Sequence, residues 1–411
     1  MKQSKLFGKT TKEIPKDEVS KNAELLIRSG FVDKLMAGVY TYLPLGLRVL
    51  KKIQAIVREE METLGGQEIY MPALTPKDNW VKTSRWDEID VLFKLQGTGD
   101  KEYALGSTHE EIVTPLVKKF VNSYKDLPVA VYQIQDKFRD EARAKSGLLR
   151  GREFSMKDLY SFHRNEEDLA DFYEKSKQAY LNVFKRCGLD AHIVEASGGV
   201  FSKFSHEFQV FTESGEDKIY VCNSCGRHQN EEIVENQTLK CPYCGNDRII
   251  EKSIEVGNIF ELKTKFTTAF DFTYTDEAGK EQPVQMGCYG IGPSRVMGSV
   301  VEVHHDDKGM IWPESMAPYQ VHLVALGDDE KVLAQAESLY QELIKSGVET
   351  LFDDREVQAG QKLNDADLIG LPIRLIISSK TLDKNFVEMK KRNSSEVELI
   401  KIAKVSKLFT K

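Results

Sequence analysis

The sequence has no long hydrophobic run. Nowhere do 18 consecutive apolar residues occur, so no segment is expected to cross a membrane as a helix. The first 22 residues alternate charged and polar side chains without the apolar run of a secretory signal. They contain no arginine and several acids, which is atypical of an organellar transit peptide. We therefore expect a cytoplasmic protein with no membrane partner.

An excess of positive charge is also missing. Lysine and arginine total 57 against 64 aspartate and glutamate, and the net charge of −7 excludes a polycation that coats nucleic acid nonspecifically. Contact with a nucleic acid must then come from a local patch. The last 41 residues, with ten basic and four acidic side chains, are a candidate, although a solvated strand face gives the same count. With 41% apolar residues and no internal repeat, the 411 residues should form two or three domains.

Cysteine is scarce, and its distribution is uneven. Four of the six cysteines form two C-x2-C pairs, Cys222 with Cys225 and Cys241 with Cys244. In a reducing compartment this spacing is typical of a zinc site rather than of disulfides. Four thiolates fill a tetrahedral shell and leave no open position, so we predict a structural zinc ribbon without a catalytic role. A module that holds a different metal, or none, is the alternative.

The pattern of apolar residues predicts three kinds of structure. Two strand-like runs, 129–138 and 153–162, flank a basic, turn-rich loop and predict an antiparallel hairpin, and helical spacing follows over 166–188. Strands and helices alternate after residue 318, which predicts a small α/β domain. The expected division is a catalytic core in two parts (1–214 and 251–317), a zinc-ribbon-like insert (215–250) and a C-terminal domain (318–411).

Two segments combine arginine with a rigid backbone. Phe138-Arg139-Asp140-Glu141 ends the first hairpin strand and Arg152-Glu153-Phe154 begins the second, so fixed guanidinium groups could bind phosphate while the loop reaches RNA. Gly290-Ile291-Gly292-Pro293-Ser294-Arg295 places glycines and an arginine at a helix start, where the backbone can approach an anion closely. Taken singly, each segment also has a purely structural explanation. The first could be a solvated basic hairpin, and the second could serve tight packing between a strand and a helix.

Together and in this order, the motifs make the chain similar to class II aminoacyl-tRNA synthetases, specifically the prolyl-tRNA synthetase family. The resemblance covers nearly the whole chain. The matching segments are Leu43–Gly46 with Met71–Leu74 (motif 1, dimer-forming), Phe138–Glu141 with Gly151–Phe154 (motif 2), Gly287–Arg295 (motif 3), Thr108–Glu111 and Ser205–Phe208 (pocket segments), and Asp353–Arg355, Gly360, Lys362 and Asp367–Pro372 (anticodon-binding domain). It implies an α+β fold, with a class II antiparallel sheet flanked by helices, a zinc-ribbon-like insert and a C-terminal α/β anticodon-binding domain.

The resemblance also implies which residues bind the amino acid. Thr108 and Glu110 would hold the secondary ammonium of L-proline, because a carboxylate beside a hydroxyl suits a cation with two N–H donors. Arg139 would bridge the proline carboxylate and the α-phosphate of ATP. His206 and Cys288 would line the pocket. The alternatives are a structural histidine and a nucleophilic cysteine, the latter without an evident partner base.

For ATP the resemblance implies a second set. Arg295 would bind the γ-phosphate and lie over adenine, Phe154 would stack on its other face, and Glu141 would approach its amino group. Arg152 and Gly292 would complete the ATP site. Arg139, Glu141 and Arg295 would act in catalysis. No nucleophilic residue is needed, because positioning and electrostatics, with Mg²⁺ on the phosphates, can carry adenylate formation. The implied partners are tRNA(Pro) and a second copy of the chain in a homodimer.

In two places the sequence departs from the family. Only 78 residues separate Phe208 from Gly287, which leaves no room for the editing domain of common bacterial members. A proline pocket excludes smaller alanine only weakly, so we expect alanine to be activated and mischarged tRNA not to be cleared in cis. We also expect no counterpart of the extra C-terminal zinc-binding domain of archaeal and eukaryotic members.

Three other functions remain as alternatives. A threonyl enzyme would use a catalytic zinc with an open position, whereas the four cysteines suggest a closed site. A catalytically silent tRNA-binding relative could tolerate loss of the ATP-contacting residues, yet Arg139, Glu141 and Arg295 are all present. A free-standing nucleic-acid-binding zinc protein would leave most of the chain unexplained.

Overall fold

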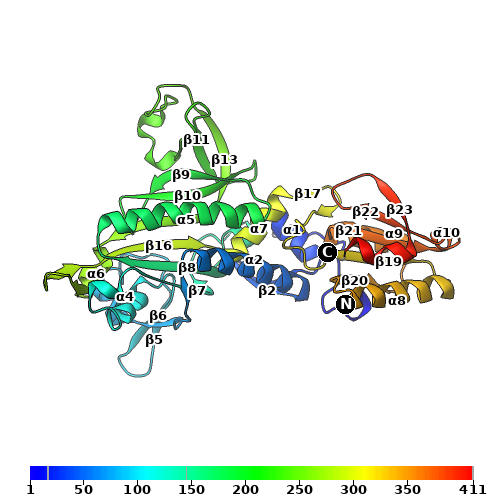
Figure 1. The fold of residues 1–411 in the computed structure, drawn as a ribbon, viewed down its shortest axis with the longest axis horizontal. Coiled ribbons are helices and arrows are strands. Elements are labelled where there is room, and N and C mark those ends of the chain that lie inside the picture. Colours follow the sequence, from blue (N-terminus) through cyan, green and yellow to red (C-terminus); the bar gives the residue numbers. More distant parts are fainter. Residues whose placement is uncertain (16–17, 145, 410–411) are drawn as a thin grey trace. The chain divides into compact units, whose positions relative to one another are not determined.

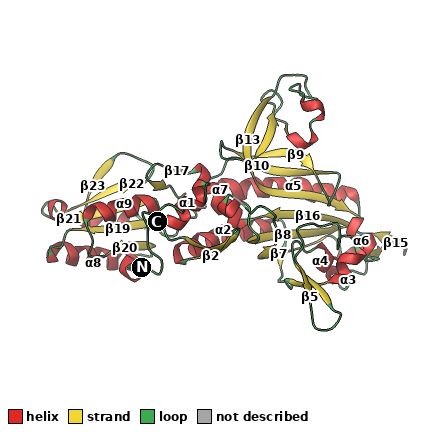
Figure 2. Cartoon of the chain, turned by 180° about the vertical axis from the view of Figure 1, so that it is seen from behind, coloured by secondary structure: helices red, strands yellow, loops and turns green. Residues whose placement is uncertain are grey.

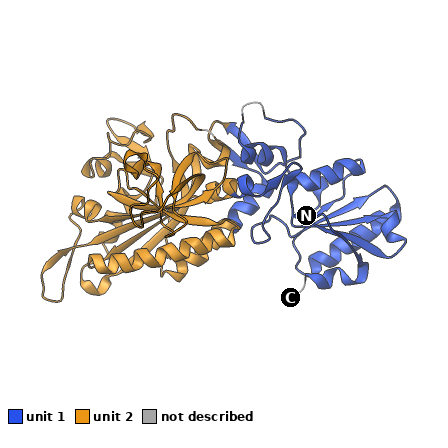
Figure 3. Ribbon diagram, turned by 90° about the horizontal axis from the view of Figure 1, so that it is seen from above, with its two compact units in different colours: residues 1–35, 40–52, 300–411 blue, residues 36–39, 53–299 orange. Residues whose placement is uncertain are grey.

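The computed structural model describes residues 1–15, 18–144 and 146–409. Contacts between residues divide the chain into two units, which Figure 3 colours separately. Unit 1 comprises residues 1–35, 40–52 and 300–411, and unit 2 comprises residues 36–39 and 53–299. Among the described helices, none combines the length and the apolar character needed to cross a membrane.

Unit 2 contains a sheet of nine strands, drawn in yellow in Figure 2. The strand order is β10-β9-β12-β11-β13-β16-β8-β7-β3, and β10 also pairs with β13. All pairs are antiparallel except β3 with β7 and β12 with β9. The strands are β3 Gln67–Glu68, β7 Val129–Phe138, β8 Glu153–His163, β9 Ala191–Ser197, β10 Phe204–Phe211, β11 Asp217–Val221, β12 His228–Asn230, β13 Ile249–Lys263 and β16 Gln285–Ile291.

The predicted hairpin is confirmed by strands β7 and β8. They pair without a register break from Val129 opposite Phe162 to Phe138 opposite Glu153. Because side chains alternate across a strand, Asp158, Tyr160 and Phe162 of β8 face one side of the sheet while Leu159 and Ser161 face the other. The hairpin therefore holds motif 2 on a rigid support.

Helix α5 (Glu166–Arg186) covers one face of the sheet, as Figure 1 shows. The side chain of Asn165 caps its first turn by accepting a hydrogen bond from the Asp168 amide at 2.8 Å. Tyr180 of α5 packs on Phe208 of β10, with ring centroids 4.9 Å apart. The helix predicted over 166–188 is thus present, and Gly188, at φ 79°, ends it in the left-handed conformation that glycine adopts readily.

The opposite face of the sheet carries α4 (Glu110–Lys118) and α6 (Lys265–Ala269), which lie on the other side from α5 in Figure 1. Val113 and Val117 of α4 share a buried core with Tyr160 and Phe162 of β8. Smaller elements border this side. They are α3 Lys77–Lys82, the sheet β4-β6-β5 (Leu74–Pro76, Glu102–Leu105, Lys94–Gln96) and the hairpin of β14 Thr273–Thr275 with β15 Glu281–Pro283.

The cysteine module lies at one end of this sheet. Strand β13 pairs with β11 over residues 249–253 and with β10 and β16 beyond them, so one long strand joins the module to the core. Strand β12 completes the module by pairing with β11 and β9. The module is therefore an extension of the central sheet.

Unit 1 contains a five-stranded mixed sheet in the order β20-β19-β21-β22-β23. Its core joins Val321 and Leu323 of β19 to Leu339 and Leu343 of α8, which confirms the predicted α/β alternation. Its remaining elements are α1 Lys21–Arg28, β1 Val32–Met36, β2 Val39–Tyr42, α2 Pro44–Thr63, α7 Pro293–Val303, β17 His305–Asp306, β18 Gly309–Met310, β19 Val321–Leu326, α8 Glu330–Lys345, β20 Thr350–Asp353, α9 Ala359–Ile369, β21 Ile373–Ser378, α10 Ser379–Leu382, β22 Phe386–Lys391 and β23 Val397–Lys401, some of which extend into unit 2.

The fold class agrees with the prediction. Between α2 and α3 the chain forms two short strands in different sheets: β3 pairs with β7, and β4 pairs with β6. Pro72 lies between the two and has no N–H to donate to a ladder. The Met71 backbone bonds to side chains instead, with its N–H donating to Gln133 and its carbonyl accepting from Gln135.

Candidate active site

A cavity of about 240 Å³ lies in unit 2, on the face of the sheet away from α5. Strands β7, β8, β13 and β16 supply about half of its lining residues, and loops and the start of α7 supply the others. Seven of the residues singled out in the sequence line it together: Thr108, Arg139, Glu141, Phe154, Cys288, Gly292 and Arg295. The fold thus gathers motifs 2 and 3 and the Thr108 loop around one space.

Arg139 lies in the cavity with its guanidinium weakly bonded. It follows β7, and its backbone N–H donates to the Arg152 carbonyl at 2.8 Å. Its guanidinium carbon lies 5.2 Å from the Phe154 ring centroid, and among the described residues the group makes only long bonds, of 3.4 and 3.5 Å, to the Ser107 carbonyl. Burial and the nearby charge of Arg295 lower the pKa of Arg139. A concentrated positive charge here suits a bound anion.

Arg295 approaches the cavity from the first turn of α7. Its Nε donates to the Leu149 carbonyl at 2.9 Å, and one terminal nitrogen lies 2.8 Å from a Glu255 carboxylate oxygen. Glu255 was not anticipated from the sequence, because it lies inside the long strand β13 with no motif around it. The pair leaves part of the guanidinium exposed to the cavity.

Glu141 and the arginines of the hairpin loop form a second polar group. The Glu141 carboxylate accepts from Arg150 at 2.8 and 2.9 Å. Arg152, expected at the ATP site, instead donates to the backbone carbonyls of Glu141, at 3.1 Å, and Ala37, at 3.0 Å. It is not among the residues that line the cavity. Its contacts fix the return of the loop rather than face the cavity.

Thr108 lines the other end of the cavity, and Glu110 lies directly behind it, fully buried and not itself among the lining residues. The Thr108 hydroxyl donates to one Glu110 carboxylate oxygen at 2.6 Å, and the Cys288 thiol donates to the other at 3.2 Å. Burial raises the pKa of Cys288 well above its usual value, so this thiol stays protonated and is a poor nucleophile. This end of the cavity is acidic and suits a small cation.

A buried network that the sequence did not reveal supports this end. Lys137 lies 2.8 Å from Asp158 and donates to Nδ1 of His109 at 2.6 Å. Since Nδ1 accepts, Nε2 of His109 carries the proton and donates to the Pro72 carbonyl at 3.0 Å. Burial and the Lys137 charge lower the pKa of His109 to about 4, which keeps the ring neutral. One feature of the sequence could have pointed to Lys137: it lies two residues before Arg139, at the end of β7, so the two side chains are expected on the same side of the chain.

The structure does not bring His206 to the cavity. Nδ1 of His206 lies 2.8 Å from the Tyr173 hydroxyl of α5, on the covered side of the sheet. Its ring borders a different hollow, together with Glu195, Phe204 and residues of the cysteine module. Burial lowers the pKa of His206 to about 4.

The four clustered cysteines converge in the module. All four sulfur atoms lie within 4.8 Å of one another, with Cys222 and Cys244 at 3.5 Å and Cys225 and Cys241 at 3.7 Å. A tetrahedral zinc with bonds near 2.3 Å places its sulfurs about 3.8 Å apart, so the spacing fits. Backbone amides, first that of Cys225, lower the pKa of Cys222 to about 6 and favour the thiolate that a metal binds.

Comparison with known families defines the class of the chain. Residues 93–304 match the family described as tRNA synthetase class II core domain (G, H, P, S and T). Residues 320–411 match the family described as anticodon binding domain. The chain is therefore a class II synthetase core joined to an anticodon-binding domain.

Individual relatives narrow the class. A proline–tRNA ligase of Dehalococcoides mccartyi (strain 195) is 34% identical over 98% of this chain and 98% of its own, and one of Halothermothrix orenii is 34% identical over 96% of each chain. This chain belongs to the proline–tRNA ligase family. The first alignment spans 555 residues, more than the 411 present here, so that relative has stretches without a counterpart in this chain.

Two solved structures share the fold. Prolyl-tRNA synthetase of Cryptosporidium parvum, complexed with halofuginone and AMPPNP, has a TM-score of 0.78 and 18% identity over 94% of this chain and 75% of its own. Giardia lamblia prolyl-tRNA synthetase, in complex with prolyl-adenylate, has a TM-score of 0.78 and 20% identity over 93% of this chain and 74% of its own.

Proposed function

We propose that this chain joins L-proline to tRNA(Pro) in two steps, through a prolyl-adenylate. The observation that carries the proposal is the polarity of the cavity: at one end the buried Glu110 carboxylate lies directly behind Thr108 and Cys288, which line it, and Arg139 and Arg295 line the other, strongly basic end. A zwitterionic amino acid fits between the two ends with its ammonium at the acid and its carboxylate toward the arginines. The triphosphate then extends along the basic end.

At the acidic end, Thr108 and Glu110 take the two N–H donors of the prolyl ammonium. The Thr108 hydroxyl already donates to Glu110, so the carboxylate is oriented before substrate arrives. Cys288 donates its thiol proton to the same carboxylate and forms part of the pocket wall. Its role is to line the pocket and not to attack the substrate.

At the basic end, Arg139 contacts the proline carboxylate and the α-phosphate and stabilises the charge that grows as the carboxylate attacks phosphorus. Phe154 and Arg295 enclose adenine, Glu141 accepts from its amino group, and Gly292 lets the nucleotide approach the backbone. Glu255 and Asp217 border the hollow beside Arg295, and their carboxylate oxygens are the donors that Mg²⁺ prefers. When bound, Mg²⁺ neutralises phosphate charge.

Amino-acid-dependent ATP–pyrophosphate exchange tests the proposed function. We expect proline to stimulate exchange far above threonine, and alanine to give a measurable background because a missing methylene costs only about 1–3 kcal/mol of discrimination. Incubation of alanyl-tRNA(Pro) with the chain should then show no deacylation above the uncatalysed rate. Exchange by a threonyl enzyme would be stimulated more by threonine than by proline, and exchange by a catalytically silent relative would not be stimulated by any amino acid.

We propose that the four cysteines hold one structural Zn²⁺ ion. Elemental analysis should find about one zinc per chain, and Cys241→Ser should lose it. Because none of the four lines the cavity, proline-dependent exchange should stay within a few-fold of the wild type. Cys187→Ala, which alters a buried cysteine outside the cluster, is the matched control and should retain zinc. Absence of metal from freshly purified wild type would contradict the proposal.

We also propose that the chain forms a homodimer through the segment that resembles motif 1. In unit 2, Leu74 of this segment is solvent-exposed (51%), as are Tyr70 (80%), directly before the segment, and Met36 (54%). Exposed apolar residues of this size favour burial against a partner. Light scattering should give about twice the 46.7 kDa mass of the chain, and a mass of one chain at micromolar concentration would oppose it.

A further inference from the structure

Arg85 is a buried arginine that the proposed mechanism does not use. It follows helix α3, and its backbone N–H donates to the Trp80 carbonyl at 2.9 Å. Only 1% of the residue is exposed, and its guanidinium carbon lies within 6 Å of three aromatic rings, those of Phe201 (4.8 Å), Phe266 (5.1 Å) and Trp80 (5.7 Å). A buried guanidinium is costly unless it is paired with negative charge.

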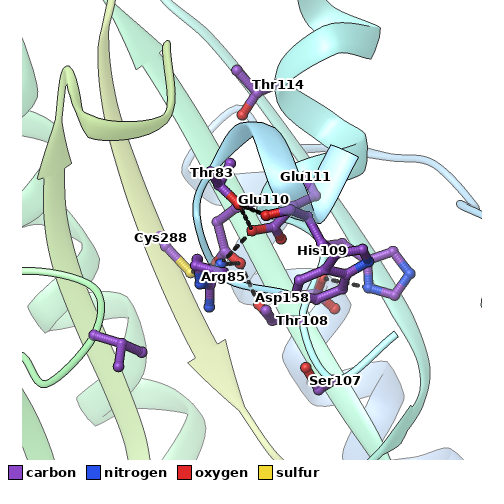
Figure 4. Close-up of polar contacts among 12 residues, drawn as sticks. Thr83, Arg85, Ser107, Thr108, His109, Glu110, Glu111, Thr114, Asp158 and Cys288 are labelled. Atoms are coloured by element: carbon purple, nitrogen blue, oxygen red, sulfur yellow. Dashed lines mark hydrogen bonds and ion pairs between the residues drawn. The ribbon is translucent and has the colours of Figure 1, made fainter. Parts of the chain in front are cut away.

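The partners of Arg85 are the first two residues of helix α4, as Figure 4 shows. One terminal nitrogen lies 2.8 Å from Glu111 and 3.3 Å from Glu110. Thr83 donates its hydroxyl to the same Glu111 oxygen at 2.9 Å. Two fully buried carboxylates thus share Arg85 as the cation in direct contact with both, while Lys137 and Arg139 act on Glu110 from further away.

This charge balance decides whether Glu110 can bind a cation. Two adjacent buried carboxylates repel each other, and without a cation one of them takes up a proton. Burial and the Glu110 charge raise the pKa of Glu111 to about 7 even with Arg85 present, and its second oxygen has no hydrogen-bond partner among the described residues. A neutral Glu110 would hold an ammonium far less tightly than a charged one.

We propose that Arg85 is a positioning residue for the substrate ammonium: it orients Glu110 and compensates the charge of the Glu110–Glu111 pair, and the bound ammonium adds a second positive charge beside that pair. Arg85 also supports the wall of the cavity, because its guanidinium stacks on Phe201, which lines it. The inference rests on the proposed function, since it takes Glu110 as the ligand of the prolyl ammonium. It adds that selectivity for a singly charged cation depends on Arg85, which lies behind the pocket wall and contacts Glu110.

The test compares KM values in ATP–pyrophosphate exchange. Arg85→Met should raise the KM for proline by about 30-fold or more, while the KM for ATP changes less than about threefold. Tetrahydrofuran-2-carboxylate, in which an oxygen replaces the ring nitrogen, offers Glu110 no cation, so its inhibition constant should change less than about threefold. A purely structural role would weaken proline, ATP and the analogue together, and that result would overturn the inference.

A double variant keeps the test decisive if Arg85→Met folds poorly. Arg85→Met with Glu111→Gln removes one charge of each sign, so Glu110 no longer competes with a second carboxylate, and the KM for proline should return to within about tenfold of the wild type. No recovery in the folded double variant contradicts the charge-balance argument. Arg248→Met, which removes a buried arginine that stacks on Tyr220 and bonds to neutral partners, is the matched control and should leave the KM for proline unchanged.

Glu110→Gln separates the two levels of the proposal. If it leaves the KM for proline unchanged, the assigned role of Glu110 has failed. If it raises that KM while Arg85→Met does not, only the inference about Arg85 has failed.

Discussion

Arg139→Ala should reduce proline-dependent ATP–pyrophosphate exchange by about 10²–10³-fold, the usual cost of removing one preorganised donor to a developing negative charge. The side chain lines the cavity and stacks on Phe154, and within the described part of the chain its guanidinium makes only long bonds, to the Ser107 carbonyl, so its donors are available to substrate. Arg139→Lys should recover only part of the activity, because an ammonium lacks the planar fork that contacts two oxygens at once.

The control for this variant is Arg164→Ala, which removes an exposed arginine at the end of the same strand pair, outside the cavity. Exchange by Arg164→Ala should stay within twofold of the wild type. Thermal unfolding of both variants checks that the folds are intact. Exchange by a folded Arg139→Ala within a few-fold of the wild type would show that the basic end of the cavity does not carry the chemistry.

Lys137→Met should lower the free energy of unfolding of unit 2 by about 3–5 kcal/mol, because it leaves a buried carboxylate without its cation. Lys137 is 2.8 Å from Asp158, and both side chains are almost completely inaccessible to solvent. The change also removes the donor to Nδ1 of His109. Urea unfolding can be followed by the fluorescence of Trp80 and Trp86, in a Trp312→Phe background that removes the tryptophan of unit 1.

Lys157→Met is a matched control from the neighbouring strand. Lys157 is equally buried but bonds to neutral groups, the Tyr180 hydroxyl and the Tyr289 carbonyl at 3.0 Å, so its loss should cost at most about 2 kcal/mol. Equal losses in the two variants would contradict the ion-pair explanation.

Lys157 should also make the free energy of unfolding depend on pH. Burial lowers the pKa of Lys157 to about 7, whereas an unfolded lysine titrates near about 10.4. Between these values the unfolded chain holds more protons than the folded one, so this group makes the free energy of unfolding rise with pH, by up to about 1.4 kcal/mol per unit. Lys157→Met should remove that rise between pH 7 and 9.

The cysteine module and the motif 2 hairpin show how far the sequence alone could predict the site. Residues 129–138 and 153–162 are two strand-like runs joined by a turn-rich loop, a pattern that requires no distant partner to be recognised. The C-x2-C pairs predicted a cluster of four cysteines, whose sulfurs the structure brings within 4.8 Å of one another. These features are local in sequence, so their spacing determined them.

Arg152 and His206 mark the limit of that reasoning. Both lie in segments that resemble family motifs, yet Arg152 bonds to backbone carbonyls and His206 contacts Tyr173 on the covered side of the sheet. Arg152 precedes β8 in the loop, and His206 lies on β10, so the packing of the loop and the face of the sheet decide what each side chain contacts.

The sequence by itself determined the order of elements, the hairpin, the cysteine cluster and the family resemblance. Tertiary structure alone decided that Arg85 meets Glu110 and Glu111, that Lys137 meets Asp158 and that Glu255 meets Arg295. Each of these pairs joins residues 20 or more positions apart, on different elements. The energy of a buried charge depends on every neighbour that surrounds it, and those neighbours are brought together only when the sheet and its helices pack.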